Sequence, residues 1–309
     1  MSQKIHNYYF EWYNYFVNKF DKYFVERSIS YEGKTVAVTG ATGSLGYYIS
    51  RYVLLKGAKL IIVGRNEKKI QATICELKTE FPNNEISSLK CDSSNIEETI
   101  QLAKDLERSK IDYLFNNAGC YHLPVKIIDG HDITFTTNFI SPIYLTNYLC
   151  DKLPNLTIVQ TGSISYCFSK LNVNDIESRK KSKTNRYGNS KRLLTLATLK
   201  LQEKYNNKLY LTHPGVSTTS LFSSSKGGFG KTFDKIIVPI MKVIFLKPSK
   251  AALSIALAPS FAYKKETLIG PRGLFQVWGY PKLHKLTYKK FNKKEKDNID
   301  DIIFKNIIF

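Results

Sequence analysis

The chain has 309 residues, of which 43% are hydrophobic, so it is long enough to bury a substantial core in one large domain or two small ones. Its 46 lysines and arginines against 26 acidic residues give a net charge of +20, a balance that favours anionic partners. The five cysteines are scattered and form no C-x-x-C pair, which argues against a disulfide framework or a zinc site, and we expect no metal. The chain shows no secretory signal and no apolar run of about 20 residues, so we expect a cytoplasmic protein without a spanning helix.

Aromatic residues crowd the first segment, residues 1–32, which we expect to be an amphipathic helical extension. The residues that recur there at helical spacing are Ile5, Tyr9, Trp12, Phe16, Phe20 and Tyr23. We expect this helix to fold back onto the main domain, because Glu11, Asp21 and Glu26 dilute the positive charge that an anionic membrane would attract. Peripheral contact with a membrane interface is the alternative.

From Gly33 onward, short runs rich in β-branched residues alternate with longer helix-like stretches. Apolar strands separated by helices are typical of a buried parallel sheet with helices on both faces. We therefore expect an α/β fold with a doubly wound parallel sheet of about seven strands. The strand candidates are residues 34–40, 59–64, 85–91, 111–119, 155–162 and 208–215. Ligands of such sheets bind at the carboxyl ends of the strands.

Two segments toward the end of the chain interrupt this alternation. Residues 221–250 begin with glycines and serines and continue as an apolar run, a pattern that suggests a lid over an apolar pocket. Residues 281–309 are rich in lysine, and we interpret them as a basic tail. The expected organisation is therefore the extension 1–32, a catalytic domain 33–280 that includes the lid, and the tail 281–309.

The sequence "VTGATGSLG" (38–46) follows the first strand and opens a helix. Its glycines, Gly40, Gly43 and Gly46, allow a tight turn and a close approach of backbone N–H groups to a pyrophosphate at a helix N-terminus. The second strand ends in Gly64-Arg65, where a carboxylate would bind the adenosine ribose of NAD. A guanidinium at this position suits a phosphate instead, so NADP (NADPH) is favoured over NAD.

These motifs, together with those further along, resemble the short-chain dehydrogenase/reductase family from about Lys34 to about Thr219. The glycine spacing is similar to the family's T-G-x-x-G-x-x-G variant, "CDSS" supplies Asp92, and "NNAG" and "HPGVSTTS" follow later strands. The resemblance implies a Rossmann fold with the nicotinamide cofactor at these positions. The implied cofactor-binding residues are Gly40, Thr42, Gly43, Ser44, Leu45, Gly46, Arg65, Asp92, Asn117, Ala118, Gly119, Tyr187, Lys191, Pro214, Gly215 and Thr219.

The pattern Y-x-x-x-K places Tyr187 and Lys191 one turn apart on a helix, where the ammonium would lower the pKa of the phenol. The resemblance implies that Tyr187 is the general acid or base, and that Lys191 also holds the nicotinamide ribose. It implies that Ser163 hydrogen-bonds the substrate oxygen, with Ser165 as the alternative serine. Asn138 is the fourth implied catalytic residue, and it would hold a water that links Lys191 to solvent.

The segment "LNVNDIESRKKSKTN" makes the gap between Ser163 and Tyr187 long, which resembles the retinol-dehydrogenase-like and protochlorophyllide-reductase-like branch of the family. The resemblance implies an NADP-dependent oxidoreductase acting on the carbonyl or alcohol of an apolar small molecule. The alternatives are an NADP-dependent epimerase or dehydratase, and a non-catalytic cofactor-sensing or membrane-surface protein. We expect no nucleic-acid partner, because the positive charge is the only feature that favours one and the sequence shows no recognition helix or aromatic platform. Peripheral membrane contact and a homodimer stay open.

Overall fold

The computed structural model describes residues 19–121, 123–172, 174–215, 246–286 and 291–302. Several sequence predictions lie outside these residues: Thr219, residues 221–245 of the expected lid, and residues 1–18 of the expected N-terminal helix. No helix among the described residues is long and apolar enough to cross a membrane.

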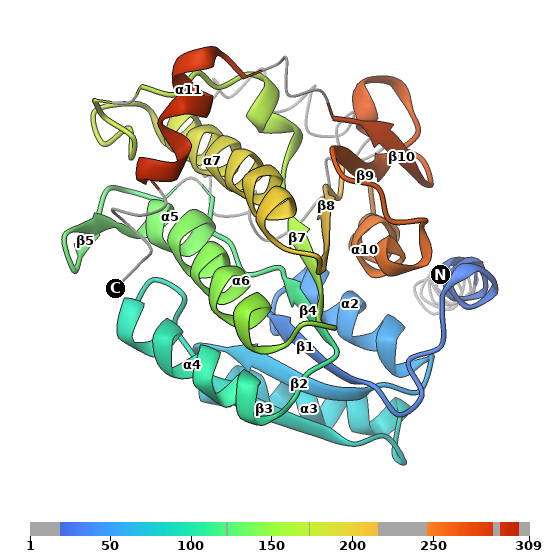
Figure 1. The fold of residues 1–309 in the computed structure, drawn as a ribbon. Helices are drawn as coiled ribbons and strands as arrows, with labels where there is room; N and C mark the ends of the chain where they lie inside the picture. Colours follow the sequence, from blue (N-terminus) through green and yellow to red (C-terminus); the bar gives the residue numbers. More distant parts are fainter. Residues whose placement is uncertain (1–18, 122, 173, 216–245, 287–290, 303–309) are drawn as a thin grey trace, which may run out of the picture.

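A central sheet of eight strands, in the order β10-β9-β8-β7-β4-β1-β2-β3, forms the middle layer of the molecule (Figure 1). All of its strands run parallel except β10, which pairs antiparallel with β9. This confirms the predicted doubly wound sheet. The strands are β1 Thr35–Thr39, β2 Lys59–Gly64, β3 Ile86–Lys90, β4 Tyr113–Asn116, β7 Thr157–Thr161, β8 Lys208–Thr212, β9 Thr267–Pro271 and β10 Pro281–Lys285.

The strand order reverses beside β1, whose Val36 pairs with Leu60 of β2 on one side and with Tyr113 of β4 on the other. The carboxyl ends of β1 and β4 therefore flank the switch point, where ligands of open α/β sheets bind. A short separate hairpin, β5 Ile127–Ile128 and β6 His131–Asp132, lies beyond the end of β4.

Helices cover both faces of the sheet. Successive side chains of each strand point to opposite faces, so each strand contributes to both apolar layers. In β1, Ala37 belongs to the cluster under α4, α6 and α7, whereas Val36 and Val38 belong to the cluster under α2, α3 and α10. The helices are α2 Ser44–Leu54, α3 Glu67–Glu80, α4 Ile96–Arg108, α5 Ile133–Phe135, the π-helix η1 Thr136–Ile140, α6 Ser141–Lys152, α7 Lys183–Lys204, α10 Pro248–Ala256 and α11 Lys293–Asp297. Short 3₁₀ turns are η2 Ile164–Cys167, η3 Ala258–Ser260 and η4 Leu274–Gln276.

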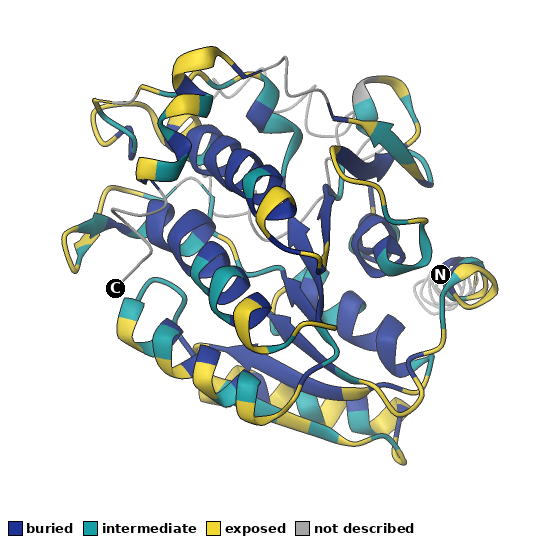
Figure 2. Cartoon of the chain, in the orientation of Figure 1, coloured by how far each residue is buried: buried dark blue, intermediate teal, exposed yellow. Residues whose placement is uncertain are grey.

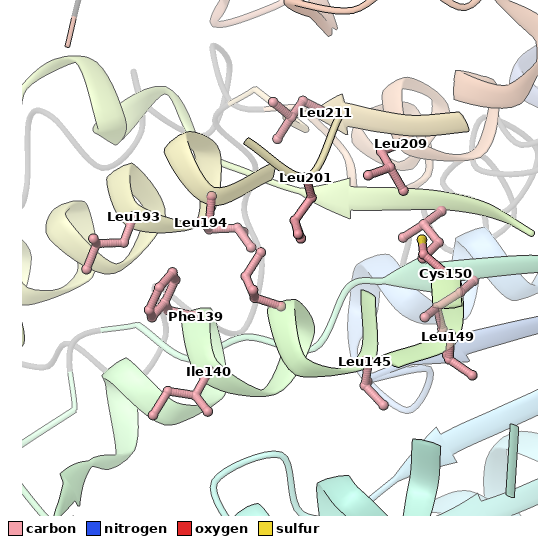
Figure 3. Packing of buried hydrophobic residues seen from close by; sticks show 14 of the residues in the cluster. Phe139, Ile140, Leu145, Leu149, Cys150, Leu193, Leu194, Leu201, Leu209 and Leu211 are labelled. Atoms are coloured by element: carbon pink, nitrogen blue, oxygen red, sulfur yellow. The ribbon is translucent and has the colours of Figure 1, made fainter. Parts of the chain in front are cut away.

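Helix α7 is the most deeply buried of the long helices, and Figure 2 shows it buried along most of its length. Figure 3 shows Leu193 and Leu194 on the side of α7 that faces Phe139 of η1. Because α7 carries Tyr187 and Lys191, the apolar packing around it fixes the position of both side chains.

The described part of the N-terminal extension, residues 19–27, is helical and packs on the domain. Phe20 and Phe24 are buried, and the Phe24 ring stacks on Tyr52 of α2 with a centroid distance of 4.7 Å. Tyr23 stacks on Tyr280 with a centroid distance of 4.1 Å. These contacts agree with the expectation that the extension folds back onto the domain.

The lysine-rich segment from residue 281 belongs to the same fold, which corrects its interpretation as a tail. Strand β10 extends the sheet, and Phe291, Ile299 and Ile302 are buried in the cluster that contains the α7 leucines. The apolar side of this segment was not recognised in the sequence because of its many lysines. An edge strand and a surface helix each expose one polar side and bury the other.

Candidate active site

The turn between β1 and α2 depends on two of its glycines. Gly40 has a φ of +65°, and a Cβ on it would lie 2.9 Å from the Cα of Ala118. A Cβ on Gly46 would lie 2.2 Å from the Gly40 carbonyl oxygen. Both positions therefore require glycine, one for the left-handed turn and the other for the close contact of α2 with it.

The ends of β1 and β4 are tied together by side chains of Thr39 and Asn117. The backbone N–H groups of Asn117 and Ala118 each donate to Thr39 Oγ1 over 3.0 Å. Asn117 Nδ2 donates to the Thr39 carbonyl oxygen over 3.1 Å. The "NNAG" segment therefore holds the glycine turn in place.

Helix α2 begins at Ser44 with Gly43 as its N-cap, and no side chain caps its first N–H groups. Its first turn contains no acidic residue. Uncapped N–H groups and the positive end of the helix dipole together favour an anion at this point. The turn therefore offers free N–H groups that can bind a phosphate group.

A cleft of about 490 Å³ runs across the carboxyl ends of β1, β2, β3 and β4. All the predicted cofactor residues from this half of the chain line it: Gly40, Thr42, Gly43, Ser44, Leu45, Gly46, Arg65, Asp92, Asn117, Ala118 and Gly119. At one end the Arg65 guanidinium, 74% exposed, lies 3.9 Å from the Asp92 carboxylate. The opposite end is lined by Tyr121, Leu123 and Ile133.

The sequence analysis missed several residues that line this cleft. Lys69 lies in the first turn of α3, one turn after Arg65, so the spacing in "GRNEKK" carried a usable signal for a second cation. Tyr121 and Leu123 follow "NNAG" in an irregular segment, where neither periodicity nor a motif indicates which side chains face a ligand.

Tyr187 and Ser163 meet beyond the aromatic end of the cleft. The Tyr187 hydroxyl lies near the Ser163 side chain, which lowers the pKa of the phenol, and the Tyr187 ring packs edge-on against Tyr121 with a centroid distance of 4.8 Å. Ser163 follows β7 and caps the 3₁₀ turn η2, while Ser165 Oγ donates to Ser163 Oγ over 3.0 Å. Ser163 is therefore the serine beside the tyrosine, and Ser165 is hydrogen-bonded to it.

Lys191 and Asn138 are the other two residues that the sequence predicts to be catalytic. Lys191 Nζ donates to the Thr161 carbonyl oxygen over 2.8 Å. Asn138, in the π-helix η1, accepts from the Cys120 N–H and donates to the Cys120 carbonyl oxygen, both over 2.9 Å. Its Nδ2 also donates to Ser190 Oγ over 3.0 Å. The Asn138 side chain thus braces the chain after β4 against α7.

Burial controls the pKa values of the tyrosine and the lysine. It raises the pKa of Tyr187 to about 12, against a smaller lowering by the Ser163 hydrogen bond. It lowers the pKa of Lys191 to about 8. A Tyr187 pKa lowered by Lys191 was expected, and the opposite direction holds here because desolvation of the phenolate outweighs the other effects.

The turn after β8 brings Pro214 and Gly215 to the same edge of the sheet. Gly215 has a φ of +78°, and its N–H donates to Nδ1 of the buried His213 over 3.0 Å. Burial lowers the pKa of His213 to about 4, so the ring is neutral at pH 7. Since Nδ1 accepts, Nε2 carries the proton and donates to Gln276 Oε1 over 3.1 Å.

The described residues contain no cluster of three or more histidine, cysteine or acidic side chains that could hold a metal ion. The structure instead places a tyrosine beside a serine, a buried lysine on the helix of that tyrosine, and a glycine turn that leads into an uncapped helix. This arrangement can bind a dinucleotide and donate a proton beside it.

Comparisons with known proteins agree with this arrangement. A family model described as short chain dehydrogenase matches residues 34–228. An uncharacterised oxidoreductase of Schizosaccharomyces pombe is 30% identical over 262 residues, which are 77% of this chain and 76% of that protein. Human retinol dehydrogenase 13 is 27% identical over 71% of this chain and 70% of its own length. The solved NADPH-dependent 3-quinuclidinone reductase of Rhodotorula rubra shares the fold, with a TM-score of 0.56, 19% identity, and coverage of 76% of this chain and 89% of that one.

Proposed function

This chain belongs to the short-chain dehydrogenase family, and from that premise we propose that it is an NADP-dependent oxidoreductase acting on a carbonyl or alcohol of an apolar small molecule. The observation that carries the proposal is the buried Tyr187 hydroxyl beside the Ser163 side chain. It lies beside Tyr121, a residue that also lines the phosphate-binding cleft. A proton donor therefore stands at one end of a dinucleotide-sized site.

The residues of the cleft fit a dinucleotide phosphate cofactor. The uncapped start of α2 would hold the pyrophosphate, and Arg65 and Lys69 would hold a phosphate on the adenosine ribose. Asn117, Ala118 and Gly119 would border the rest of the cofactor. When bound, NADPH supplies the hydride.

Tyr187 is suited to act as the acid in carbonyl reduction. With a pKa raised to about 12, its hydroxyl is protonated at neutral pH and can pass its proton to the carbonyl oxygen of the substrate. Ser163 donates a hydrogen bond to that oxygen as negative charge develops on it. The Lys191 ammonium then stabilises the tyrosinate that is left behind.

The preference for NADP over NAD rests on the two cations at the end of β2 and the start of α3. We expect NADPH to bind at least about tenfold more tightly than NADH, which corresponds to about 1.4 kcal/mol. Arg65→Asp should reverse or abolish the preference, and Lys69→Ala should weaken NADPH binding while leaving NADH binding unchanged. Fluorescence titration of both cofactors measures this.

Lys68 provides the matched control, because it is exposed and adjacent to Lys69 but does not line the cleft. Lys68→Ala should leave both affinities unchanged. Equal affinities of the unmodified chain for NADPH and NADH would refute the proposed cofactor preference.

An apolar substrate is supported by Tyr121, Leu123 and Ile133 at the catalytic end of the cleft and by the relative named for retinol. NADPH oxidation across matched apolar and polar aldehydes and ketones tests it, with higher kcat/KM expected for the apolar members. Binding of NADPH without net oxidation on any member would favour the epimerase, dehydratase or non-catalytic alternatives. Faster turnover of the polar members would reject the substrate class alone.

A further inference from the structure

Arg192 follows Lys191 in α7 and forms a buried ion pair with Glu295 of α11. Arg192 Nε donates to Glu295 Oε1 over 2.6 Å, and Nη2 donates to Glu295 Oε2 over 2.7 Å. The exposed fractions of the two side chains are 7% and 1%. This bidentate geometry joins the helix of the catalytic candidates to the last described helix of the chain.

Glu295 is itself held in place by its own helix and by a loop. Its side chain accepts from the Asn292 N–H over 2.8 Å, as part of the capping box that begins α11. It also accepts from the Leu171 N–H over 3.2 Å. Leu171 belongs to the long segment between Ser163 and Tyr187, so one carboxylate joins α7, α11 and this segment.

Arg192 reaches in the other direction, to the turn that carries Ser163. Its Nη1 donates to the Tyr166 carbonyl oxygen over 2.9 Å. The Tyr166 N–H in turn donates to the Ser163 carbonyl oxygen over 3.2 Å. The Arg192 guanidinium carbon lies 4.6 Å from the centroid of the Phe291 ring, and this ring stacks on Tyr166.

We propose that Arg192 and Glu295 are positioning residues that hold the Ser163 turn against Tyr187 and Lys191. Tyr187 belongs to α7 and Ser163 is the N-cap of η2, so keeping the two side chains beside each other requires a fixed distance between these elements. The Arg192 guanidinium bonds the η2 carbonyl from α7, and Glu295 keeps that guanidinium oriented. The inference rests on the proposed catalytic role of Tyr187 and Ser163.

Stability alone does not require an ion pair at this point. Replacing a buried ion pair with apolar residues of similar volume often leaves a protein equally stable. Such a replacement would keep the packing of α7 on α11 but remove the bond to the Tyr166 carbonyl oxygen. The double variant Arg192→Met/Glu295→Leu separates the two roles.

The matched control is a second ion pair between the same two parts of the chain. Lys200 Nζ lies 3.2 Å from Asp300 Oδ2, and these side chains are 38% and 46% exposed. Lys200→Met/Asp300→Leu removes a charge pair between α7 and the C-terminal segment without touching the Ser163 turn. We expect it to leave kcat unchanged.

The experiment compares three forms of the full chain, each with 3-fluorotyrosine incorporated at position 187. The ¹⁹F resonance and its pH titration report the surroundings of the Tyr187 ring whether or not a substrate has been found. In Arg192→Met/Glu295→Leu we expect a shifted resonance, a titration closer to that of free fluorotyrosine, and a kcat at least tenfold lower. NADPH affinity should change less than threefold, because neither Arg192 nor Glu295 lines the cleft. In the control pair, the resonance and its titration should match those of the unmodified chain.

An unchanged resonance and titration in the Arg192/Glu295 variant, or an unchanged kcat, would overturn the inference. If that variant does not fold, Arg192→Lys replaces it, since lysine keeps the charge but cannot bond both Glu295 oxygens and the Tyr166 carbonyl together. The same ¹⁹F change is then expected, and its absence would overturn the inference equally. A chain that turns over no carbonyl substrate would refute the proposed function, and the ¹⁹F comparison would still decide the positioning role.

Discussion

At the scale of single residues, Lys191 and Tyr187 are governed by how deeply they are buried. Lys191 is 4% exposed, and its ammonium donates to the Thr161 carbonyl oxygen. Its charged form is therefore held in the protein at a cost in folding free energy. A residue kept at such a cost is better explained by chemistry than by packing.

The first prediction concerns folding stability and pH. Burial lowers the pKa of Lys191 from 10.5 to about 8, which corresponds to about 3 kcal/mol at neutral pH. Between pH 8 and 10 the unfolded chain binds this proton while the folded chain has released it. The contribution of Lys191 to the free energy of unfolding should therefore rise with pH across this range.

Lys191→Met removes the buried charge, so it should stabilise the protein at pH 7 by about 1–3 kcal/mol and remove this part of the pH dependence. Urea unfolding of both chains at pH 7 and pH 9 measures the effect. A variant that is clearly less stable than the parent at pH 7 would contradict the assignment of Lys191 as a strained, functional lysine. Lys200→Met, an exposed position on the same helix, is the control.

The spacing of the glycines was sufficient to predict the glycine turn, whereas the prediction that Ser163 lies near Tyr187 came from the family resemblance, because the gap between these two residues is long. The sequence was not sufficient for the direction of the Tyr187 pKa, because desolvation depends on residues such as Tyr121 that reach the tyrosine from another part of the chain. Lys69 was missed for a simpler reason. Its position in the first turn of α3 had to be considered together with that of Arg65 to show that both cations face the same cleft.

At the scale of elements, a buried arginine attaches the N-terminal helix to the dinucleotide-binding half. Arg51 of α2 donates to both oxygens of Asp21, over 2.6 and 2.7 Å, and also to Glu80 of α3. The N-terminal helix is thus bonded to the helix that follows the glycine turn. This contact involves the charged side of the helix, whereas Phe20 and Phe24 fill its apolar side.

The second prediction tests this attachment. Asp21→Ala should lower the free energy of unfolding by about 1–3 kcal/mol, because Arg51 stays buried with one of its two carboxylates missing. Glu26→Ala is the control, since Glu26 pairs with Lys22 and Arg27 in exposed positions and its removal should cost less than about 0.5 kcal/mol. Thermal or urea unfolding compares the two. Equal losses in both variants would mean that the helix is not fixed through Asp21.

The parallel strands up to β8, apart from the partly exposed β3, could be predicted from their apolar runs, because both of their faces are buried. Strands β9 and β10 were missed for two different reasons. β9 contains Gly270 and ends at Pro271, two residue types that are depleted in strands, and β10 is an edge strand whose exposed positions include lysines. Edge strands often carry such charges, which resemble a loop in a sequence.

At the scale of the whole molecule, the described residues after 280 pack into the same apolar cluster as α7. Leu286, Phe291, Ile299 and Ile302 belong to the cluster that contains Leu193 and Leu201. The described part of this segment therefore contributes to the layer that holds α7 against the sheet. Its exposed side carries Lys282, Lys285, Lys293 and Lys294.

The third prediction uses this arrangement. Ile299→Ala should lower the free energy of unfolding by about 2–5 kcal/mol, as expected for a fully buried isoleucine. Lys294→Ala, on the exposed side of the same segment, should change it by less than about 0.5 kcal/mol. Urea unfolding followed by tryptophan fluorescence measures both. A silent Ile299→Ala would restore the interpretation of this segment as a tail.

The central claim is that Tyr187 donates the proton during NADPH-dependent carbonyl reduction, and one comparison tests it most directly. Tyr187→Phe removes the hydroxyl but retains the ring that packs against Tyr121. NADPH binding and NADPH oxidation are measured in the same preparations of the parent and the variant, with the substrate on which the parent is most active. We predict that kcat falls by at least about 10²-fold while the Kd for NADPH changes less than threefold. A variant that reduces the carbonyl at close to the parent rate would contradict the account.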